Sequence, residues 1–274
     1  MRGEFLDLGG ARLYYYAAGT RGAGVPVVFL HGFPTSSHLW GDVVPLMPPG
    51  HRLVVLDLLG YGRSDRPGAH PVDIGAHAER TIALLDELRI DRACFVGHGI
   101  GGGIAQALAV HHARRVSHLC LTDCVALDDR PAIGGRLART MLPIARFLPS
   151  KLLLAILRRD IARGYVDPNH SERSIDLYLR PFCDAAGHAA IVTHIEALAR
   201  DGMADLTGRL SNVSAPTSLV WGQQDRVVPV SVGRRLQAAI PGATLDVIAG
   251  ARHFTPEESP RQIADAIAAL LERG

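Results

Sequence analysis

Short apolar runs alternate with helix-like segments along most of this chain, and this alternation is the feature that most constrains its fold. The runs have the length and composition of strands that are buried on both faces. They span residues 27–30, 53–56, 93–96, 119–121 and 218–221. Helical periodicity covers residues 76–88, 102–112, 230–239 and 260–272. Strand–helix alternation of this kind predicts an α/β fold with a mostly parallel sheet and helices on both faces.

Two regions depart from the alternation. Residues 5–17 predict two strands that turn at Gly9 and Gly10. Residues 127–205 have helical periodicity interrupted by prolines and contain no convincing strand. We therefore expect a core of about eight strands formed by residues 1–126 and 206–274, with a helical lid (or cap) inserted at residues 127–205.

The segment 96–103, Val-Gly-His-Gly-Ile-Gly-Gly-Gly, directly follows a predicted strand and opens a predicted helix. Gly-x-nucleophile-x-Gly in this setting is the pattern of a nucleophile elbow, which points its central residue at a substrate. Here the central residue is Gly99. The glycines at 97, 99 and 102 also satisfy the dinucleotide-binding pattern G-x-G-x-x-G, with Asp123 placed as the acidic ribose partner after the next strand.

Segments elsewhere in the chain decide between these two interpretations. His31-Gly32-Phe33-Pro34 follows a predicted strand, Asp225 follows the strand at 218–221, and His253 comes later still. The order nucleophile position, acid, histidine is the order of a hydrolase triad on an α/β sheet. A dinucleotide-binding domain would explain none of these segments, so we favour the elbow.

The motifs HGFP at 31–34 and GHGIGGGIAQ at 97–106 resemble the α/β-hydrolase superfamily, and the resemblance covers nearly the whole chain. The most similar branch is that of epoxide hydrolases and haloalkane dehalogenases, together with lid-bearing esterases. The resemblance implies an α/β-hydrolase fold with an eight-stranded sheet and an aspartate or serine at the elbow. This chain departs from the pattern because Gly99 has no side chain with which to attack a substrate.

The positions of the remaining residues imply their roles. His253 would be the general base, and Asp225 would hold its ring in one tautomer. The backbone N–H groups of Phe33 and Ile100 would form an oxyanion hole. Residues 255–258, Thr-Pro-Glu-Glu, predict a capping box that fixes the loop carrying His253.

Other residues are candidates for supporting roles. Tyr165 and Tyr178 are candidate substrate-binding residues, because the resemblance to epoxide hydrolases implies lid tyrosines that donate hydrogen bonds; the simpler alternative for both is packing within the lid. Trp40 is a third candidate, which either lines the pocket or anchors its helix. His98 is expected to pack below the elbow. Asp123 is an alternative acid for His253 or, more simply, a cap at the end of its strand.

Composition narrows the possible partners and location. The chain has 29 basic and 27 acidic residues, which argues against nucleic acid or an anionic membrane as a partner. We expect no metal and no cofactor, because no Cys/His spacing or HExxH motif is present. The first residues lack the apolar stretch typical of a signal peptide and the cysteines form no CxxC pair, so we expect a cytoplasmic protein. We also expect a monomer or a homodimer.

Three hypotheses about function remain open. The first is an enzyme in which the His253–Asp225 pair activates water or abstracts a proton without a covalent intermediate, as a hydrolase, lyase or cyclase. The second is a hydrolase whose nucleophile has been replaced by Gly99. The third is a binding protein derived from a hydrolase. A lid rich in apolar residues favours a small or medium apolar substrate, such as an ester, lactone, epoxide or halide.

Overall fold

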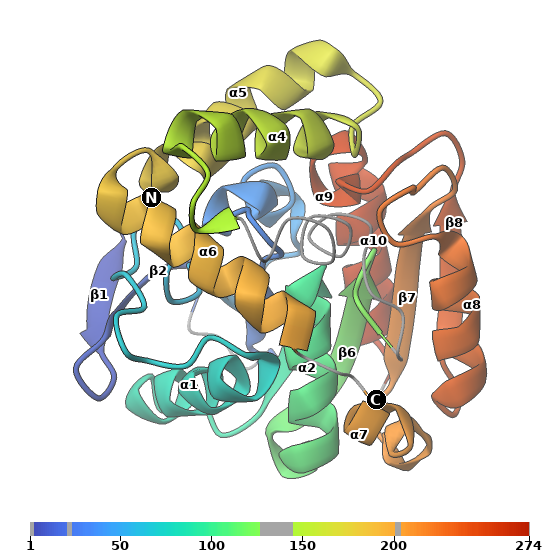
Figure 1. The fold of residues 1–274 in the computed structure, drawn as a ribbon. Helices are drawn as coiled ribbons and strands as arrows, with labels where there is room; N and C mark the ends of the chain where they lie inside the picture. The colour runs from blue at the N-terminus through green and yellow to red at the C-terminus, as the bar shows by residue number, and fades with distance from the viewer. Residues whose placement is uncertain (1–2, 21–23, 127–144, 201–203, 274) are drawn as a thin grey trace.

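A single eight-stranded sheet forms the centre of the molecule in the computed structural model, which describes residues 3–20, 24–126, 145–200 and 204–273 (Figure 1). The strand order is β1-β2-β4-β3-β5-β6-β7-β8. β2 runs antiparallel to its neighbours β1 and β4, and the other pairs are parallel. The mostly parallel eight-stranded sheet predicted from the sequence is confirmed. The strands are β1 (Glu4–Asp7), β2 (Arg12–Gly19), β3 (Val27–Leu30), β4 (Arg52–Leu56), β5 (Ala93–His98), β6 (Val116–Thr122), β7 (Thr217–Gly222) and β8 (Thr244–Ile248).

Helices cover the middle of the sheet. Every residue of β3, β5, β6 and β7 is buried, so these strands are covered on both faces, which explains their continuous apolar runs. Helix α2 packs along β5 and β6, whereas α8 and α10 pack along β7. The helices of the core are α1 (Ile74–Glu87), α2 (Ile100–His111), α8 (Val230–Ala239), α9 (Thr255–Glu258) and α10 (Pro260–Leu271).

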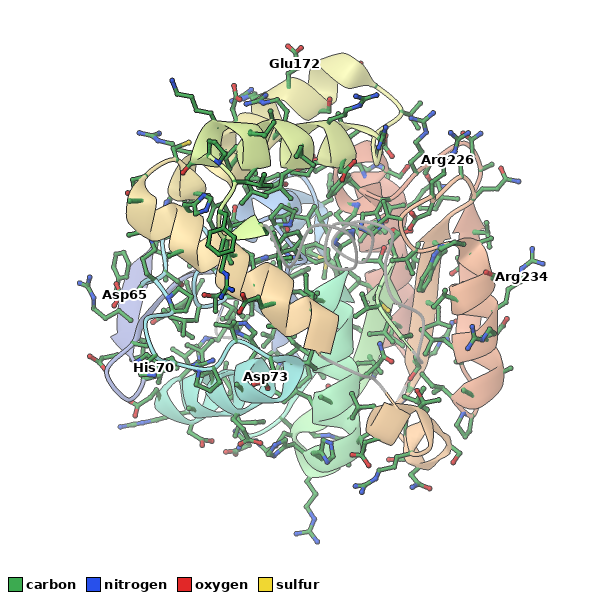
Figure 2. All side chains as sticks on the ribbon, viewed as in Figure 1. Asp65, His70, Asp73, Glu172, Arg226 and Arg234 are labelled. Atoms are coloured by element: carbon green, nitrogen blue, oxygen red, sulfur yellow. The ribbon has the colours of Figure 1, made fainter. Side chains whose placement is uncertain are left out.

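Local signals fix where the helices of the core begin. Asp73, which Figure 2 shows beside α1, accepts a hydrogen bond at 2.8 Å from the N–H of Ala76. This side-chain cap starts α1 at Ile74, two residues before the sequence prediction. Gly99 stands at the N-cap of α2, so this helix begins at Ile100 and not at Gly102 as predicted.

The described part of the connection between β6 and β7 is mostly helical. α4 (Ser150–Ala162), α5 (Pro168–Leu179), the 3-10 helix η4 (Arg180–Phe182) and α6 (Ala185–Arg200) lie across the carboxyl ends of the strands, and we call them the lid helices (Figure 1). Residues 145–200 contain no strand. The short helix α7 (Ala204–Thr207) leads back to the core. The lid limits 127–205 stay a prediction, because residues 127–144 and 201–203 lie outside the described part of the chain.

The described residues contain neither a membrane-spanning helix nor a metal-binding cluster. None of the helices in residues 3–20, 24–126, 145–200 and 204–273 combines the length and apolar character that a bilayer span requires. The same residues contain no group of three or more His, Cys, Asp or Glu side chains arranged to hold a metal ion. Cys94, Cys120 and Cys124 are buried free thiols.

Candidate active site

Gly99 forms a sharp turn between β5 and α2. Its φ is +56° and its ψ is −123°, a conformation that residues with a side chain adopt only under strain. The flanking glycines are required by close packing. A Cβ atom on Gly97 would lie 2.4 Å from the carbonyl oxygen of Gly101, and one on Gly102 would lie 2.2 Å from Cβ of Cys124. The glycine pattern therefore serves the approach of helix to strand, as an elbow requires.

His253 and Asp225 meet at the carboxyl end of the sheet. Nδ1 of His253 lies 2.9 Å from Oδ2 of Asp225. The other carboxylate oxygen of Asp225 accepts hydrogen bonds from the N–H groups of Val227 at 2.7 Å and Val228 at 3.0 Å. Both side chains are buried, at 3% exposed for His253 and 6% for Asp225. These contacts hold the ring through Nδ1 and leave Nε2 as the nitrogen available for proton transfer.

The backbone of His253 is anchored on two sides. Its N–H donates to the carbonyl of Gly164, at the end of lid helix α4, over 2.9 Å. Its carbonyl lies 2.9 Å from Nε2 of His98, directly before the elbow. Burial, together with the nearby His253, lowers the pKa of His98 well below its usual value, so His98 is neutral and donates through Nε2. His98 is fully buried below the elbow as expected, but no sequence pattern predicts its hydrogen bond to the backbone of His253.

Asp123 is a second buried carboxyl group, close to Asp225 but not bonded to His253. Its Oδ1 accepts from the N–H of Gly222 at 2.8 Å, and its Oδ2 interacts with the hydroxyls of Thr122, at 2.9 Å, and Thr255. Burial, and then the charge of Asp225, raise the pKa of Asp123 well above its usual value. Asp123 therefore closes the end of β7 and ties it to the start of α9, and the acid that holds the ring of His253 is Asp225.

The predicted capping box at residues 255–258 is wrong. The N-cap of α9 is Phe254, and no side chain caps this helix. The hydroxyl of Thr255 bonds instead to Asp123, and Glu258 accepts from the N–H of Arg252 at 3.0 Å. The buried carboxyl of Asp123 needs donors inside the protein, and this tertiary demand overrides the local capping pattern.

The lid tyrosines converge on Glu257. The hydroxyl of Tyr165 donates to Oε2 of Glu257 at 2.7 Å, and that of Tyr178 donates to Oε1. Both tyrosines are 1% exposed, and burial raises the pKa of Glu257. These bonds tie the lid to α9, which begins two residues after His253. The sequence interpretation treated Glu257 only as a capping residue and so missed this role.

The third candidate substrate-binding residue, Trp40, is fully buried in the core. Its ring packs against Phe29 with a centroid distance of 5.3 Å. The described residues that line the cavity beside Gly99 include neither Trp40 nor the two lid tyrosines. In the described structure all three residues thus make packing or lid contacts.

A small cavity of about 20 Å³ lies beside Gly99. Its walls are apolar apart from backbone amides and the ring of His253; they come from Phe33, Gly99, Ile100, Val125, Leu198, Val227, Val228 and His253. A Cβ atom on Gly99 would lie 4.0 Å from the amide nitrogen of Phe33. Among the described residues, the N–H groups of Phe33 and Ile100 have no acceptor. The cavity beside Gly99 is therefore lined both by Phe33 and Ile100, whose N–H groups lack an acceptor, and by the buried ring of His253.

An elbow that presents its central residue to an Asp–His pair at the end of a parallel sheet is the arrangement of α/β hydrolases. The family model described as "Alpha/beta hydrolase family" matches residues 27–266, and the chain belongs to this family.

Relatives span nearly the whole chain. Haloalkane dehalogenase 2 of Mycobacterium tuberculosis (strain ATCC 25618 / H37Rv) is 31% identical over 288 residues, which cover 98% of this chain and 94% of the relative. An alpha/beta hydrolase fold protein from Burkholderia ambifaria superposes with a TM-score of 0.84 at 27% identity, over 98% of this chain and 100% of the other. A structure described as "Est816 as an N-Acyl homoserine lactone degrading enzyme" has a TM-score of 0.76 at 29% identity, over 97% and 99%. The named sequence relatives include a haloalkane dehalogenase and a 2-hydroxymuconate semialdehyde hydrolase, and the protein is accordingly an enzyme of the hydrolase type.

Proposed function

We propose that this protein hydrolyses a small or medium apolar ester or lactone, using water activated by His253 in place of a side-chain nucleophile. The observation that carries the proposal is the cavity at the elbow. It lies between Gly99, the amide of Phe33 and the ring of His253. A cavity of about 20 Å³ is large enough for one water molecule, for which ~10–15 Å³ is the minimum.

The unused amides favour a carbonyl substrate over an epoxide or a halide. Phe33 and Ile100 both line the cavity at the elbow, and a pair of backbone N–H donors there would stabilise the oxyanion that forms when a carbonyl carbon is attacked. The N–H of Ile100 also lies at the N-terminus of α2, where the helix dipole favours negative charge. An epoxide or carbon–halogen bond would gain less from this pair, because its leaving group departs from the side opposite the attacking atom.

The proposed hydrolysis consumes one water molecule. The water oxygen bonds to the carbonyl carbon while its proton passes to Nε2 of His253. Asp225 stabilises the resulting imidazolium through Nδ1. The tetrahedral intermediate then expels the alkoxide, which takes the proton from Nε2 and leaves as the alcohol. The products are a carboxylic acid and an alcohol, or a hydroxy acid where the substrate is a lactone.

The relatives are compatible with this substrate class. One structural relative is described as degrading a lactone, and the dehalogenase relative shows that the family also acts at carbon–halogen bonds. The intact His253–Asp225 pair argues against a pure binding protein, which would need neither group. A lyase or cyclase would use the same base to take a proton from carbon.

A second candidate is a hydrolase whose nucleophile has been replaced by glycine. Gly99 keeps the strained backbone conformation that elbows impose on a nucleophile, although glycine itself would permit others. A Cβ atom there would meet only Gly32 Cα, at 3.1 Å, and the Phe33 amide nitrogen, at 4.0 Å. The elbow could therefore hold serine or aspartate after a shift of a few tenths of an ångström.

Kinetics with mass spectrometry separate the two candidates. We expect the wild-type protein to hydrolyse a p-nitrophenyl ester or a simple lactone without forming an acyl-enzyme, and His253→Ala to lower kcat/KM by about 10²–10⁴-fold. Gly99→Ser should create an acyl-enzyme visible in the intact mass, and Gly99→Asp an alkyl-enzyme with an epoxide or haloalkane. If the wild type is inactive and these two variants turn over substrate, the replaced-nucleophile candidate is correct. Activity that survives His253→Ala would refute the role of the histidine.

A further inference from the structure

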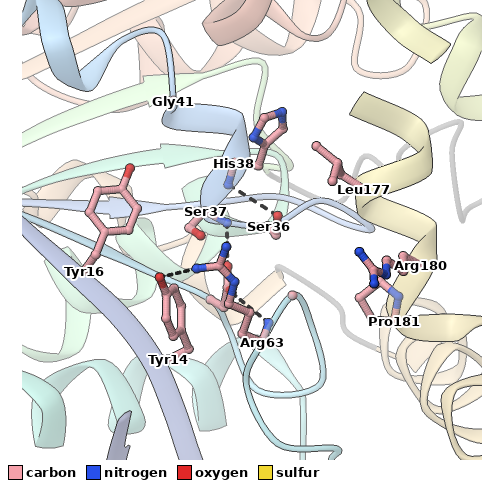
Figure 3. A pocket seen from close by; sticks show the side chains of 12 residues that line it. Tyr14, Tyr16, Ser36, Ser37, His38, Gly41, Arg63, Leu177, Arg180 and Pro181 are labelled. Carbon is pink, nitrogen blue, oxygen red and sulfur yellow. Dashed lines mark hydrogen bonds between the residues drawn. The ribbon is translucent and has the colours of Figure 1, made fainter. Parts of the chain in front are cut away.

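A second, larger pocket lies between the core and the lid helices. Its volume is about 650 Å³, within the range of small-molecule sites. Figure 3 shows Arg63 of the core on one side and Arg180 of η4 on the other, with Ser36 between them and His38 above. Leu177 of α5 and Tyr16 of β2 also line this pocket. None of these residues lines the cavity beside Gly99.

Positive charge dominates the accessible part of this pocket. Its acidic residue, Asp57, is 1% exposed, and both carboxylate oxygens are occupied by backbone amides. Oδ1 accepts from the N–H of Ser37 at 2.6 Å, and Oδ2 accepts from the N–H of Arg63 at 2.8 Å. The carboxylate thus shapes the loop from below and leaves the guanidinium groups of Arg63 and Arg180 exposed above it.

Arg63 is held in place by an aromatic ring. Its guanidinium carbon lies 4.6 Å from the ring centroid of Tyr14, and the guanidinium donates to the tyrosine hydroxyl (Figure 3). A cation stacked in this way loses less freedom when it binds a ligand, because its orientation is already set.

Arg180 has no ion-pair partner among the described residues. The acidic side chains that flank it on the lid are engaged elsewhere: Asp176 pairs with Arg158, and Asp184 lies 3.5 Å from Arg66. An exposed arginine at a pocket wall, opposite a second arginine, is suited to a carboxylate or a phosphate, which accept paired hydrogen bonds from a guanidinium.

Leu177 and Tyr16 indicate which other groups a ligand of this pocket would have. The side chain of Leu177 is 41% exposed, which gives the pocket an apolar surface beside the cations. Burial raises the pKa of Tyr16 to about 12, so its hydroxyl stays a hydrogen-bond donor at neutral pH. We propose that this pocket is a second binding site, distinct from the cavity at Gly99, for a small organic anion with a carboxylate or phosphate head group and a short apolar body.

Calorimetry with benzoate, phenyl phosphate and the neutral analogue benzamide tests the proposal. We expect saturable binding of at least one anion and much weaker binding of benzamide, and the comparison of the two anions identifies the preferred head group. Arg180→Gln and Arg63→Gln should each weaken binding by about tenfold, because each removes a charge-assisted hydrogen-bond donor. Arg180 is exposed, so its variant should fold normally.

Two controls locate the site. Arg234→Gln, on the outer surface of α8 (Figure 2), should leave the affinity unchanged, and so should His253→Ala. The proposal is overturned if neither anion binds at millimolar concentration, if benzamide binds equally well, or if the two pocket variants bind like the wild type. Loss of binding in His253→Ala would assign the anion to the catalytic cavity instead and would also overturn it. Hydrolysis is not measured, so a failure of the proposed function leaves this result intact.

Discussion

Alanine at position 99 would measure how much backbone strain the elbow contains. Gly99 has φ +56° and ψ −123°, and a Cβ atom there would lie 3.1 Å from Cα of Gly32. Holding a residue with a side chain in such a sparsely populated region costs about 1–3 kcal/mol. Alanine also restricts the unfolded chain, which offsets about 0.4–1 kcal/mol. The contact with Gly32 adds a small shift of the backbone. Strain less this offset leaves up to about 2.6 kcal/mol, and the contact with Gly32 adds to it, so we expect Gly99→Ala to lower the free energy of unfolding by up to about 3 kcal/mol.

Alanine substitutions at two other glycines provide comparisons for the change in stability at Gly99. A Cβ atom on Gly208 would meet nothing within 4 Å, and its φ is not positive. Gly208→Ala should therefore leave stability unchanged or raise it by up to about 1 kcal/mol. A Cβ atom on Gly97 would lie 2.4 Å from a backbone oxygen that cannot move away, so Gly97→Ala should fail to give a stable fold.

Urea unfolding followed by circular dichroism gives the free energies of unfolding of Gly208→Ala and Gly99→Ala, and the spectrum without urea shows whether Gly97→Ala folds. The expected order of stability is Gly208→Ala, then Gly99→Ala, then Gly97→Ala. The reasoning is refuted if Gly99→Ala is as stable as Gly208→Ala, because the turn would then be unstrained. A loss of up to about 3 kcal/mol is less than the typical domain stability of about 5–15 kcal/mol, so the variant still folds. Gly99→Ser and Gly99→Asp should therefore fold well enough for the kinetic tests above.

Two further predictions concern the buried carboxyl groups that hold the site. The folded protein binds a proton on Asp123 more tightly than the unfolded chain does, so stability should fall as pH rises from about 4 toward the raised pKa, by up to ~1.4 kcal/mol per pH unit. Asp123→Asn mimics the protonated form and should flatten this slope in urea unfolding across a pH series; an unchanged slope would show that Asp123 ionises freely. Tyr178→Phe removes a donor from buried Glu257 and should destabilise the protein by about 1–3 kcal/mol. Tyr16→Phe is the control for this loss, since its hydroxyl has no hydrogen bond among the described residues, and equal stability of both variants would contradict the proposed lid contact.

The sequence could predict the sheet because its signals are local. Strands buried on both faces have continuous apolar runs, and the residues 27–30, 93–96 and 218–221 all fall within observed strands. The elbow was equally visible, since glycines at fixed spacing between a strand and a helix are required by the approach of the two backbones. The order of Gly99, Asp225 and His253 along the chain followed the order of strands in the sheet.

What the sequence could not predict are contacts between segments far apart in the chain. Thr255 looked like a helix cap, but the buried carboxyl of Asp123, 132 residues away, takes its hydroxyl. Tyr165 and Tyr178 looked like substrate ligands, but Glu257 accepts both hydroxyls. A local pattern predicts which bonds a side chain can make.

The tertiary structure decides which of these bonds are made, because a buried polar group must be satisfied by whatever donors the fold brings to it. The same holds for the pocket between Arg63 and Arg180. Each arginine by itself is an ordinary surface residue, and only the packing of η4 over the core places the two on one cavity. By itself the sequence determined the elbow and the absence of a nucleophile in it, since both are properties of adjacent residues.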